Sequence, residues 1–257
     1  MTRIVNNCVA LVCLCLFWGQ SLRAADASHS EQIKWGNESV FNEEHNTLGL
    51  FSGVLGGQIV LAGGTSDDYS RWGRNAVCLS ENAGFALYED VLSKPLAYGA
   101  SITLSDGILC IGGRYSSQCY KDVFFVTMQQ GKLNVSEDWP PLPFPLSNAA
   151  GALLDNKVYL FGGRKSVSPS RLSDSFFVLD LSNKSRGWKE LPGYPGCVRE
   201  DAILVVQNNG VSPCLYLLGG QTETEEGLSS CLTDGYVYNP QLGKWSSLGS
   251  DFPKGIC

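Results

Sequence analysis

Several arginine and acidic side chains lie where they could meet a small ligand. Arg114 and Arg164 each come directly after a Gly-Gly pair that ends an apolar run. A planar guanidinium suits a carboxylate ligand because it can donate two parallel hydrogen bonds. Both residues are therefore candidate substrate-binding groups, and the alternative is that they are solvated loop arginines. Arg199, in the run Arg199-Glu200-Asp201, is a third and weaker candidate with the same alternative.

Other groups that could do chemistry are few. Glu223, Glu225 and Glu226 form an acidic loop that could supply a general base or be a solvated surface. Because the only two histidines are His29 and His45, a copper radical oxidase with several His ligands is disfavoured. We expect neither a cofactor nor a metal site.

Composition excludes further classes of protein. The 257 residues include 19 Lys and Arg against 25 Asp and Glu, a net charge of −6 without a basic block. We therefore expect no nucleic-acid binding, which needs cations to replace phosphate counterions. With 44% hydrophobic and 17% charged residues the chain is not disordered, and its 29 glycines favour many short strands and turns.

The N-terminus has the pattern of an export signal. Residues 1–24 combine Arg3 with a ten-residue apolar run at 9–18, with cleavage as late as residue 27. The run is too short for an ordinary membrane span, although an anchor is the alternative. We predict a periplasmic protein, or alternatively a secreted one, with no membrane contact after cleavage. Seven cysteines would remain, an odd number whose pairing stays open, and Cys110 is expected in the core.

A repeat organises the rest of the chain. Four apolar runs end in Gly-Gly, and their first glycines, Gly63, Gly112, Gly162 and Gly219, are 49, 50 and 57 residues apart. A small-residue strand precedes each run. An aromatic strand follows three of the runs, and then comes a segment with Trp139, Trp188 or Trp245. No segment has a sustained helical period, so the pattern predicts an all-β fold.

Each part of the repeat has a physical role. We expect the glycines where backbones crowd, and the tryptophans between adjacent sheets. Asp122, Asp174 and Asp234, which begin the third strands, are expected to fasten loops by accepting backbone N–H bonds. A sheet that is apolar on both faces must stack against further copies.

This unit resembles the kelch repeat of β-propellers, and another stacked β array is the alternative. The resemblance covers residues 31–257, with blades at about 49–92, 96–140, 146–192 and 198–250. The segment 32–35, with Trp35, is a ring-closing strand left without inner strands. We therefore expect the four blades to be part of a six-bladed ring in a truncated chain. The alternative is a complete four-bladed ring.

A narrower resemblance rests on the segments KPLAYGAS at 94–101, LPFPLSNAA at 142–150, TDGYVYNP with GKW at 233–245, and LFSGV at 50–54. These look like the cyclically permuted branch of the N-acetylneuraminate (sialic acid) mutarotase/epimerase family. The resemblance implies an exported enzyme that interconverts the anomers of free N-acetylneuraminate by acid/base ring opening, without a cofactor. It places the catalytic Glu and its Arg beyond residue 257, so we assign no catalytic residue. The alternative is a non-enzymatic propeller that binds carbohydrate or protein. No oligomeric state is predicted.

Overall fold

The computed structural model describes residues 48–80, 84–224, 226–249 and 251–257. The predicted signal peptide, the segment 32–35, His29, His45 and Glu225 lie outside these residues. The regular secondary structure of the described residues is almost entirely β-strand. No helix among these residues has the length and hydropathy needed to cross a membrane.

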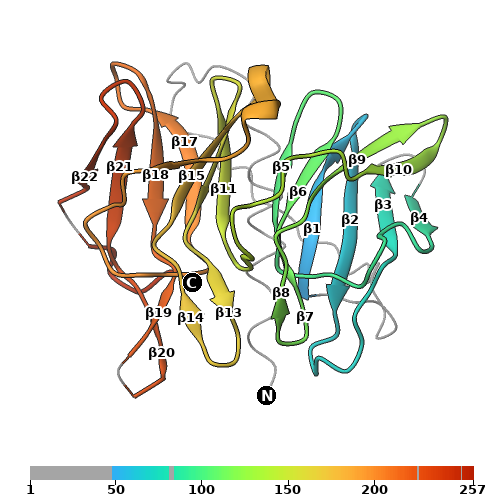
Figure 1. The fold of residues 1–257 in the computed structure, drawn as a ribbon, viewed down its shortest axis with the longest axis horizontal. Helices are drawn as coiled ribbons and strands as arrows, with labels where there is room; N and C mark the ends of the chain where they lie inside the picture. The colour runs from blue at the N-terminus through green and yellow to red at the C-terminus, as the bar shows by residue number, and fades with distance from the viewer. Residues whose placement is uncertain (1–47, 81–83, 225, 250) are drawn as a thin grey trace, which may run out of the picture. The chain divides into compact units, whose positions relative to one another are not determined.

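Four antiparallel four-stranded sheets follow one another along the chain (Figure 1). The first sheet consists of β1 (Leu48–Leu55), β2 (Gln58–Thr65), β3 (Ala76–Ser80) and β4 (Gly84–Tyr88). The second consists of β5 (Ala100–Thr103), β6 (Ile108–Ile111), β9 (Val123–Gln129) and β10 (Lys132–Ser136). The third consists of β11 (Ala150–Leu154), β12 (Lys157–Phe161), β15 (Phe176–Asp180) and β16 (Lys189–Leu191). The fourth consists of β17 (Ile203–Asn208), β18 (Pro213–Leu218), β21 (Gly235–Asn239) and β22 (Lys244–Ser247). The predicted four-bladed, kelch-type propeller is confirmed.

Three small hairpins lie at one end of the sheets, directly after the Gly-Gly pairs (Figure 1). They pair β7 (Arg114–Tyr115) with β8 (Gln118–Cys119), β13 (Arg164–Ser166) with β14 (Arg171–Leu172), and β19 (Gln221–Glu223) with β20 (Ser229–Cys231). In the first blade the corresponding loop is closed by a bridge between Thr65 and Trp72. We call this end of the propeller the hairpin end. The 3-10 helix η1 (Leu181–Arg186) and the turns that follow β5 and β11 lie at the opposite end.

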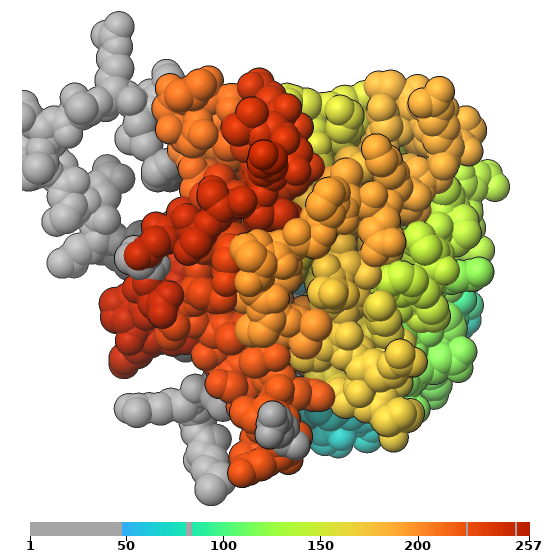
Figure 2. Space-filling view, turned by 60° about the vertical axis from the view of Figure 1, so that its left-hand side comes forward, coloured from blue at the N-terminus to red at the C-terminus, as the bar shows by residue number. Residues whose placement is uncertain are grey.

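The inner strands β1, β5, β11 and β17 touch in that order. In Figure 2 the orange and red fourth blade accordingly lies beside the yellow third blade, with the green second blade beyond it. The hydrophobic core is divided among the interfaces between blades. One cluster, including Phe51 and Phe124, joins the first two sheets, and two more join the second to the third and the third to the fourth. As predicted, Cys110 is buried in the first cluster.

Each Gly-Gly pair packs closely against the backbone of a segment that follows it in the chain. The second glycine donates its N–H to a carbonyl there, as in Gly64 to Leu96 (2.9 Å) and Gly113 to Leu146 (2.8 Å). The first glycine faces the same carbonyl: a Cβ on Gly112 would lie 2.2 Å from the Leu146 oxygen. Both glycines also have positive φ. The predicted crowding at these pairs is therefore confirmed.

The tryptophans occupy the gaps between sheets, although not all within outer strands. Trp139 follows β10 and packs on Phe125, with ring centroids 5.2 Å apart. Trp188 precedes β16 and donates its indole N–H to the carbonyl of Pro140 at 2.9 Å. The outer strands β10 and β16 therefore do not contain Trp139 and Trp188, whose indoles lie between blades.

Replacing Gly112 by alanine should destabilise the protein by about 3 kcal/mol or more, because overpacking against a fixed carbonyl adds to left-handed strain. The matched control is Gly131→Ala, where φ is +74° but nothing lies within 4 Å of the new Cβ. Its cost should be only the strain, about 1 kcal/mol. Urea unfolding of both variants measures the difference, and equal losses would show that the close approach at Gly112 is not important.

Candidate functional site

Three residues from neighbouring blades follow one another across the hairpin end. Tyr98, Asn148 and Asp201 each have a φ between 53° and 60° and directly precede or lie near an inner strand. The N–H of Asn148 donates to the carbonyl of Tyr98 at 2.7 Å, and the N–H of Asp201 donates to the carbonyl of Asn148 at 3.0 Å. Gly49 begins the series by accepting from the N–H of Tyr98 at 2.7 Å. The left-handed turn before each inner strand thus fixes the order of these side chains.

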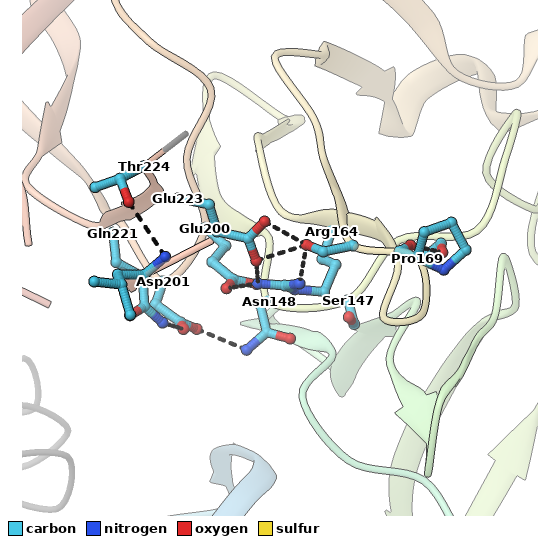
Figure 3. A network of polar contacts seen from close by, with 12 residues as sticks. Ser147, Asn148, Arg164, Pro169, Glu200, Asp201, Gln221, Glu223 and Thr224 are labelled. Atoms are coloured by element: carbon cyan, nitrogen blue, oxygen red, sulfur yellow. Dashed lines mark hydrogen bonds and ion pairs between the residues drawn. The ribbon is translucent and has the colours of Figure 1, made fainter. Parts of the chain in front are cut away.

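The carboxylate of Asp201 is held between two amides (Figure 3). Asn148 Nδ2 donates to Asp201 Oδ1 at 2.9 Å, and Gln221 Nε2 donates to Asp201 Oδ2 at 2.8 Å. Asp201 remains exposed to solvent, yet the protein atoms crowded around it raise the pKa of its carboxyl above the ordinary 3.8. The negative charge of Glu200 raises this pKa further, while the two amides and Arg164 partly oppose the rise. Asp201 therefore combines contact with solvent and a raised pKa, which suits a group that exchanges protons.

Arg164 lies beside this carboxylate and is fully engaged (Figure 3). Its Nε donates to Glu200 at 2.8 Å, its Nη2 bonds both Glu200 and Glu223, and its Nη1 donates to Ser170 Oγ at 2.5 Å. The hydrogen bonds and attraction of Glu200, helped by Glu223, raise the pKa of the guanidinium although burial opposes this. Arg164 thus joins the third blade's hairpin to two carboxylates of the fourth blade. The acidic residue Glu223, which the sequence left open between base and solvated surface, is one of its ion-pair partners.

Glu223 is held in its ionised form by this network. Hydrogen bonds from Ser170 and from Arg164, together with the charge of Arg164, lower the pKa of its carboxyl although burial opposes this. Because a general base works best with a pKa near the working pH, Glu223 suits that role less than Asp201 does.

Arg199 is buried within the fourth blade, with none of its surface exposed. Its guanidinium donates to both oxygens of Asp234, at 2.6 and 2.8 Å, and to the carbonyl of Gly219 at 2.8 Å. Its Nε donates to the Tyr194 hydroxyl at 2.9 Å. The donors of Arg199 are therefore committed to internal partners, and the structure places this candidate inside the blade and not at the hairpin end.

Arg114 differs from both other arginines. Its Nη1 donates to the carbonyl of Ser116 at 2.7 Å, and it forms no ion pair with any of the described residues. Of the three predicted substrate-binding arginines, the structure brings Arg114 and Arg164 to the hairpin end. There Arg164 has two carboxylate partners, whereas Arg114 has none among the described residues.

Two of the three aspartates that begin the third strands, Asp122 and Asp234, bind cationic side chains. Asp234 pairs with Arg199, and Asp122 accepts from Lys94 Nζ at 2.6 Å. The prediction that these aspartates fasten loops through backbone N–H groups was therefore incomplete, because nearby cations are their main partners. Burial opposes ionisation of Asp234, but Arg199 outweighs it and holds the pKa of this carboxyl below 3.8.

Cysteine pairing could not be read from the sequence. Cys231 forms a disulfide with Cys257, and the five other cysteines of the described residues are free thiols. This bridge joins β20 to the segment whose Ile256 carbonyl accepts from the N–H of Gly220 at 2.6 Å. Within the described residues no cluster of three or more His, Cys, Asp or Glu side chains is arranged to hold a metal ion.

Two hollows lie outside the Asp201 network. The larger, about 650 Å³, lies at the opposite end between the second and third blades and is lined by Asp106, Trp139 and Lys184 among others. The smaller, about 200 Å³, lies beside Lys94 and Asp122. We place the candidate site at the hairpin end because the carboxyl with a raised pKa and the arginine without a carboxylate partner both lie there.

The match to a known family lies in the same part of the chain as the Asp201 network. Residues 139–257 match the family model described as N-acetylneuraminate epimerase. N-acetylneuraminate epimerases of Yersinia pestis (strain Pestoides F) and Haemophilus influenzae (strain PittEE) are 30% and 31% identical over 123 and 121 residues, 47% of this chain and 29% of each relative. A kelch domain-containing protein of Vibrio cholerae is 32% identical over 118 residues, 46% of this chain and 30% of the relative. The chain is a kelch-type β-propeller that resembles the N-acetylneuraminate epimerases.

Coverage and sequence identity set the extent of the resemblance to these relatives. The chain spans about three tenths of the length of the curated relatives it matches. The solved structure of YjhT superposes with a TM-score of 0.60 at 13% identity, covering 78% of this chain and 68% of that one. At that identity the superposition establishes the fold alone.

The interaction between Asn148 and Asp201 was not predicted from the sequence. The signal was present in the repeat, since Tyr98, Asn148 and Asp201 occupy the same place before three inner strands. Their side chains differ, so only the alignment of strands, and not a motif, would have selected them.

Replacing Asp234 by asparagine should cost about 3 kcal/mol, because it leaves the buried guanidinium of Arg199 without a counter-charge. The matched control is Asp122→Asn, at the same place in the second blade, where Lys94 and Asp122 are both well exposed. That change should cost about 1 kcal/mol or less.

The stability that Asp234 contributes should also depend on pH. Since the folded-state pKa of Asp234 is lowered, the advantage of the parent over D234N is complete well above the ordinary pKa of 3.8. It shrinks as the pH falls through the folded pKa, and urea unfolding at several pH values measures it. A pH-independent difference would contradict the assignment.

Proposed function

We propose that this protein interconverts the α and β anomers of free N-acetylneuraminate. The supporting observation is that the match to the N-acetylneuraminate epimerase family covers the blades that carry Arg164, Glu200 and Asp201. This chain spans about three tenths of the length of those relatives. The chemical support for the proposal therefore comes from the geometry of the hairpin end.

Anomer exchange needs a group that takes a proton and later returns it. The carboxylate of Asp201 accepts the proton of the anomeric hydroxyl as the bond from the anomeric carbon to the ring oxygen breaks, and a water molecule supplies the proton to that oxygen. The keto form rotates, and the hydroxyl attacks the other face of the carbonyl while it returns its proton to the hydroxide that the water had become. The carboxyl of Asp201 returns its proton to the former keto oxygen, so the carboxylate and the water are both regenerated. The raised pKa of Asp201 lies closer to neutral pH than the pKa of an ordinary aspartate, which favours this exchange.

The surrounding side chains hold Asp201 in place for this task. Asn148 and Gln221 each donate to one carboxylate oxygen, leaving lone pairs free on the solvent side. Arg164 pairs with Glu200, whose negative charge raises the pKa of Asp201, and the positive charge of Arg164 lowers this pKa. Asn148, Gln221 and Arg164 are thus positioning residues.

Proton NMR tests the proposal by following one anomer of N-acetylneuraminate as it equilibrates with the other. The protein should accelerate exchange above the buffer rate, and Asp201→Asn should return it to that rate. Asp106→Asn, at the opposite end of the propeller, is the control and should leave the acceleration intact. Because Asp201 must be ionised to accept a proton, the enzymatic rate should fall as the pH drops through a midpoint above 3.8. Exchange no faster than in buffer would refute the enzyme and favour a non-enzymatic carbohydrate- or protein-binding propeller.

We further propose that the protein is exported to the periplasm. The N-terminal pattern of residues 1–24 and the disulfide between Cys231 and Cys257 support this, since disulfides persist in oxidising compartments. Mass spectrometry of the periplasmic fraction should find the chain beginning at residue 25 to 28, with Cys231 and Cys257 joined. Recovery of an uncleaved chain from the cytoplasm would contradict the proposal.

A further inference from the structure

Four aromatic rings gather beside Arg114 at the hairpin end. They belong to Tyr69, Trp72, Tyr98 and Tyr115, which we call the aromatic cluster. The guanidinium carbon lies 4.4 Å from the ring centre of Tyr98 and 5.3 Å from that of Trp72. Tyr115 packs edge-on against Trp72 at 5.5 Å, and the hydroxyls of Tyr69 and Tyr98 are 3.3 Å apart. Residues of the first two blades thus form one surface around a cation.

The setting of Arg114 contrasts with that of its counterpart one blade later. Arg164 occupies the same place after Gly-Gly, but Glu200 and Glu223 neutralise it. The residues one repeat earlier than these two glutamates are Ser147 and Ser166. The third blade therefore presents serines to Arg114 where the fourth presents carboxylates to Arg164, and the described residues give the Arg114 guanidinium no other acceptor than the carbonyl of Ser116. Its charge remains uncompensated in this part of the chain.

The guanidinium is held in a fixed position. The backbone of Arg114 exchanges two hydrogen bonds with Ala97, at 3.0 and 2.7 Å, directly before Tyr98. Its Nη1 is anchored on Ser116, and the aromatic rings limit the movement of the plane. Two of the rings are open to solvent, since Tyr69 is 49% and Tyr115 is 44% exposed. Arg114 is itself half-buried, so part of the side chain also meets solvent beside these rings.

We propose that Arg114 and the aromatic cluster bind a carboxylated pyranose. The carboxylate would accept hydrogen bonds from the guanidinium, and the apolar C–H face of the sugar ring would pack on the exposed aromatic rings. The choice of a sugar acid, and not another anion with an apolar face, rests on the proposed function. This assigns the recognition of the ligand to the first two blades, whereas the proton-exchanging carboxyl belongs to the fourth.

The methyl α-glycoside of N-acetylneuraminate tests this site separately from catalysis, because its anomeric centre cannot open. Saturation-transfer NMR should show contact between its ring protons and protein aromatic protons. A titration should show that Arg114→Gln weakens binding about tenfold or more, as expected for loss of a charge-assisted bidentate contact. Arg114→Lys should restore only part of the affinity, because an ammonium lacks the planar fork. N-acetylmannosamine, which has no carboxylate, and acetate, which has no ring, should each bind far more weakly.

Control variants separate recognition from folding. Arg74→Gln removes an exposed arginine that pairs with Asp90 outside the aromatic cluster, and it should leave the affinity unchanged. Tyr115→Phe should retain binding while Tyr115→Ala weakens it, because the ring face and not the hydroxyl makes the contact. Circular dichroism confirms that each variant is folded.

The outcomes distinguish this inference from the proposed function. Glycoside binding that depends on Arg114, without faster anomer exchange, would support the site and refute the enzyme. Equal affinity of the parent and R114Q, or no binding of the glycoside at millimolar concentration, would overturn the site whatever the exchange assay shows.

Discussion

The hydrogen bond from each second glycine of a Gly-Gly pair to the following segment is the contact on which the propeller depends. It repeats four times, with Gly64, Gly113, Gly163 and Gly220 as donors at 2.6 to 2.9 Å. Only a residue without a Cβ permits it, because the preceding glycine faces the same carbonyl at close range. The apolar interfaces between sheets stabilise the fold, but they are adaptable in register. The glycine contact fixes where one blade meets the next, and so which side chains meet at the hairpin end.

The hairpin end inherits its chemistry from small departures from the repeat. Three blades have the same turn before the inner strand, yet the turn carries tyrosine, asparagine or aspartate. In the same way Arg114 and Arg164 share a backbone position but not an environment, because the fourth blade supplies Glu200 where the third has Ser147. A repeated scaffold thus pairs one arginine with two carboxylates and leaves another beside aromatic rings. Function, on this account, lies in the non-repeating side chains.

The sequence predicted those features that the repeat itself encodes. The all-β class, the four blades and the crowding at Gly-Gly all follow from local patterns that recur at a nearly fixed spacing. The burial of Arg199 did not follow, because its partner Asp234 is 35 residues away and a charged run normally faces solvent. The aromatic cluster and the Asp201 network were equally out of reach, since each joins two blades through contacts between loops. The six-bladed ring and the truncation remain predictions. So does a catalytic Glu and Arg beyond residue 257, to which the proposed role of Asp201 is the alternative that the described residues offer.

The central claim is that a sugar acid binds at the hairpin end, between Arg114 with the aromatic cluster of the first two blades and Asp201 of the fourth. A crystal structure of the protein with the methyl α-glycoside of N-acetylneuraminate tests it most directly. We expect the carboxylate on the guanidinium of Arg114 and the sugar ring against the aromatic cluster, with the anomeric centre directed toward Asp201. Density for the sugar in the 650 Å³ hollow at the opposite end, beside Asp106 and Lys184, would contradict the account.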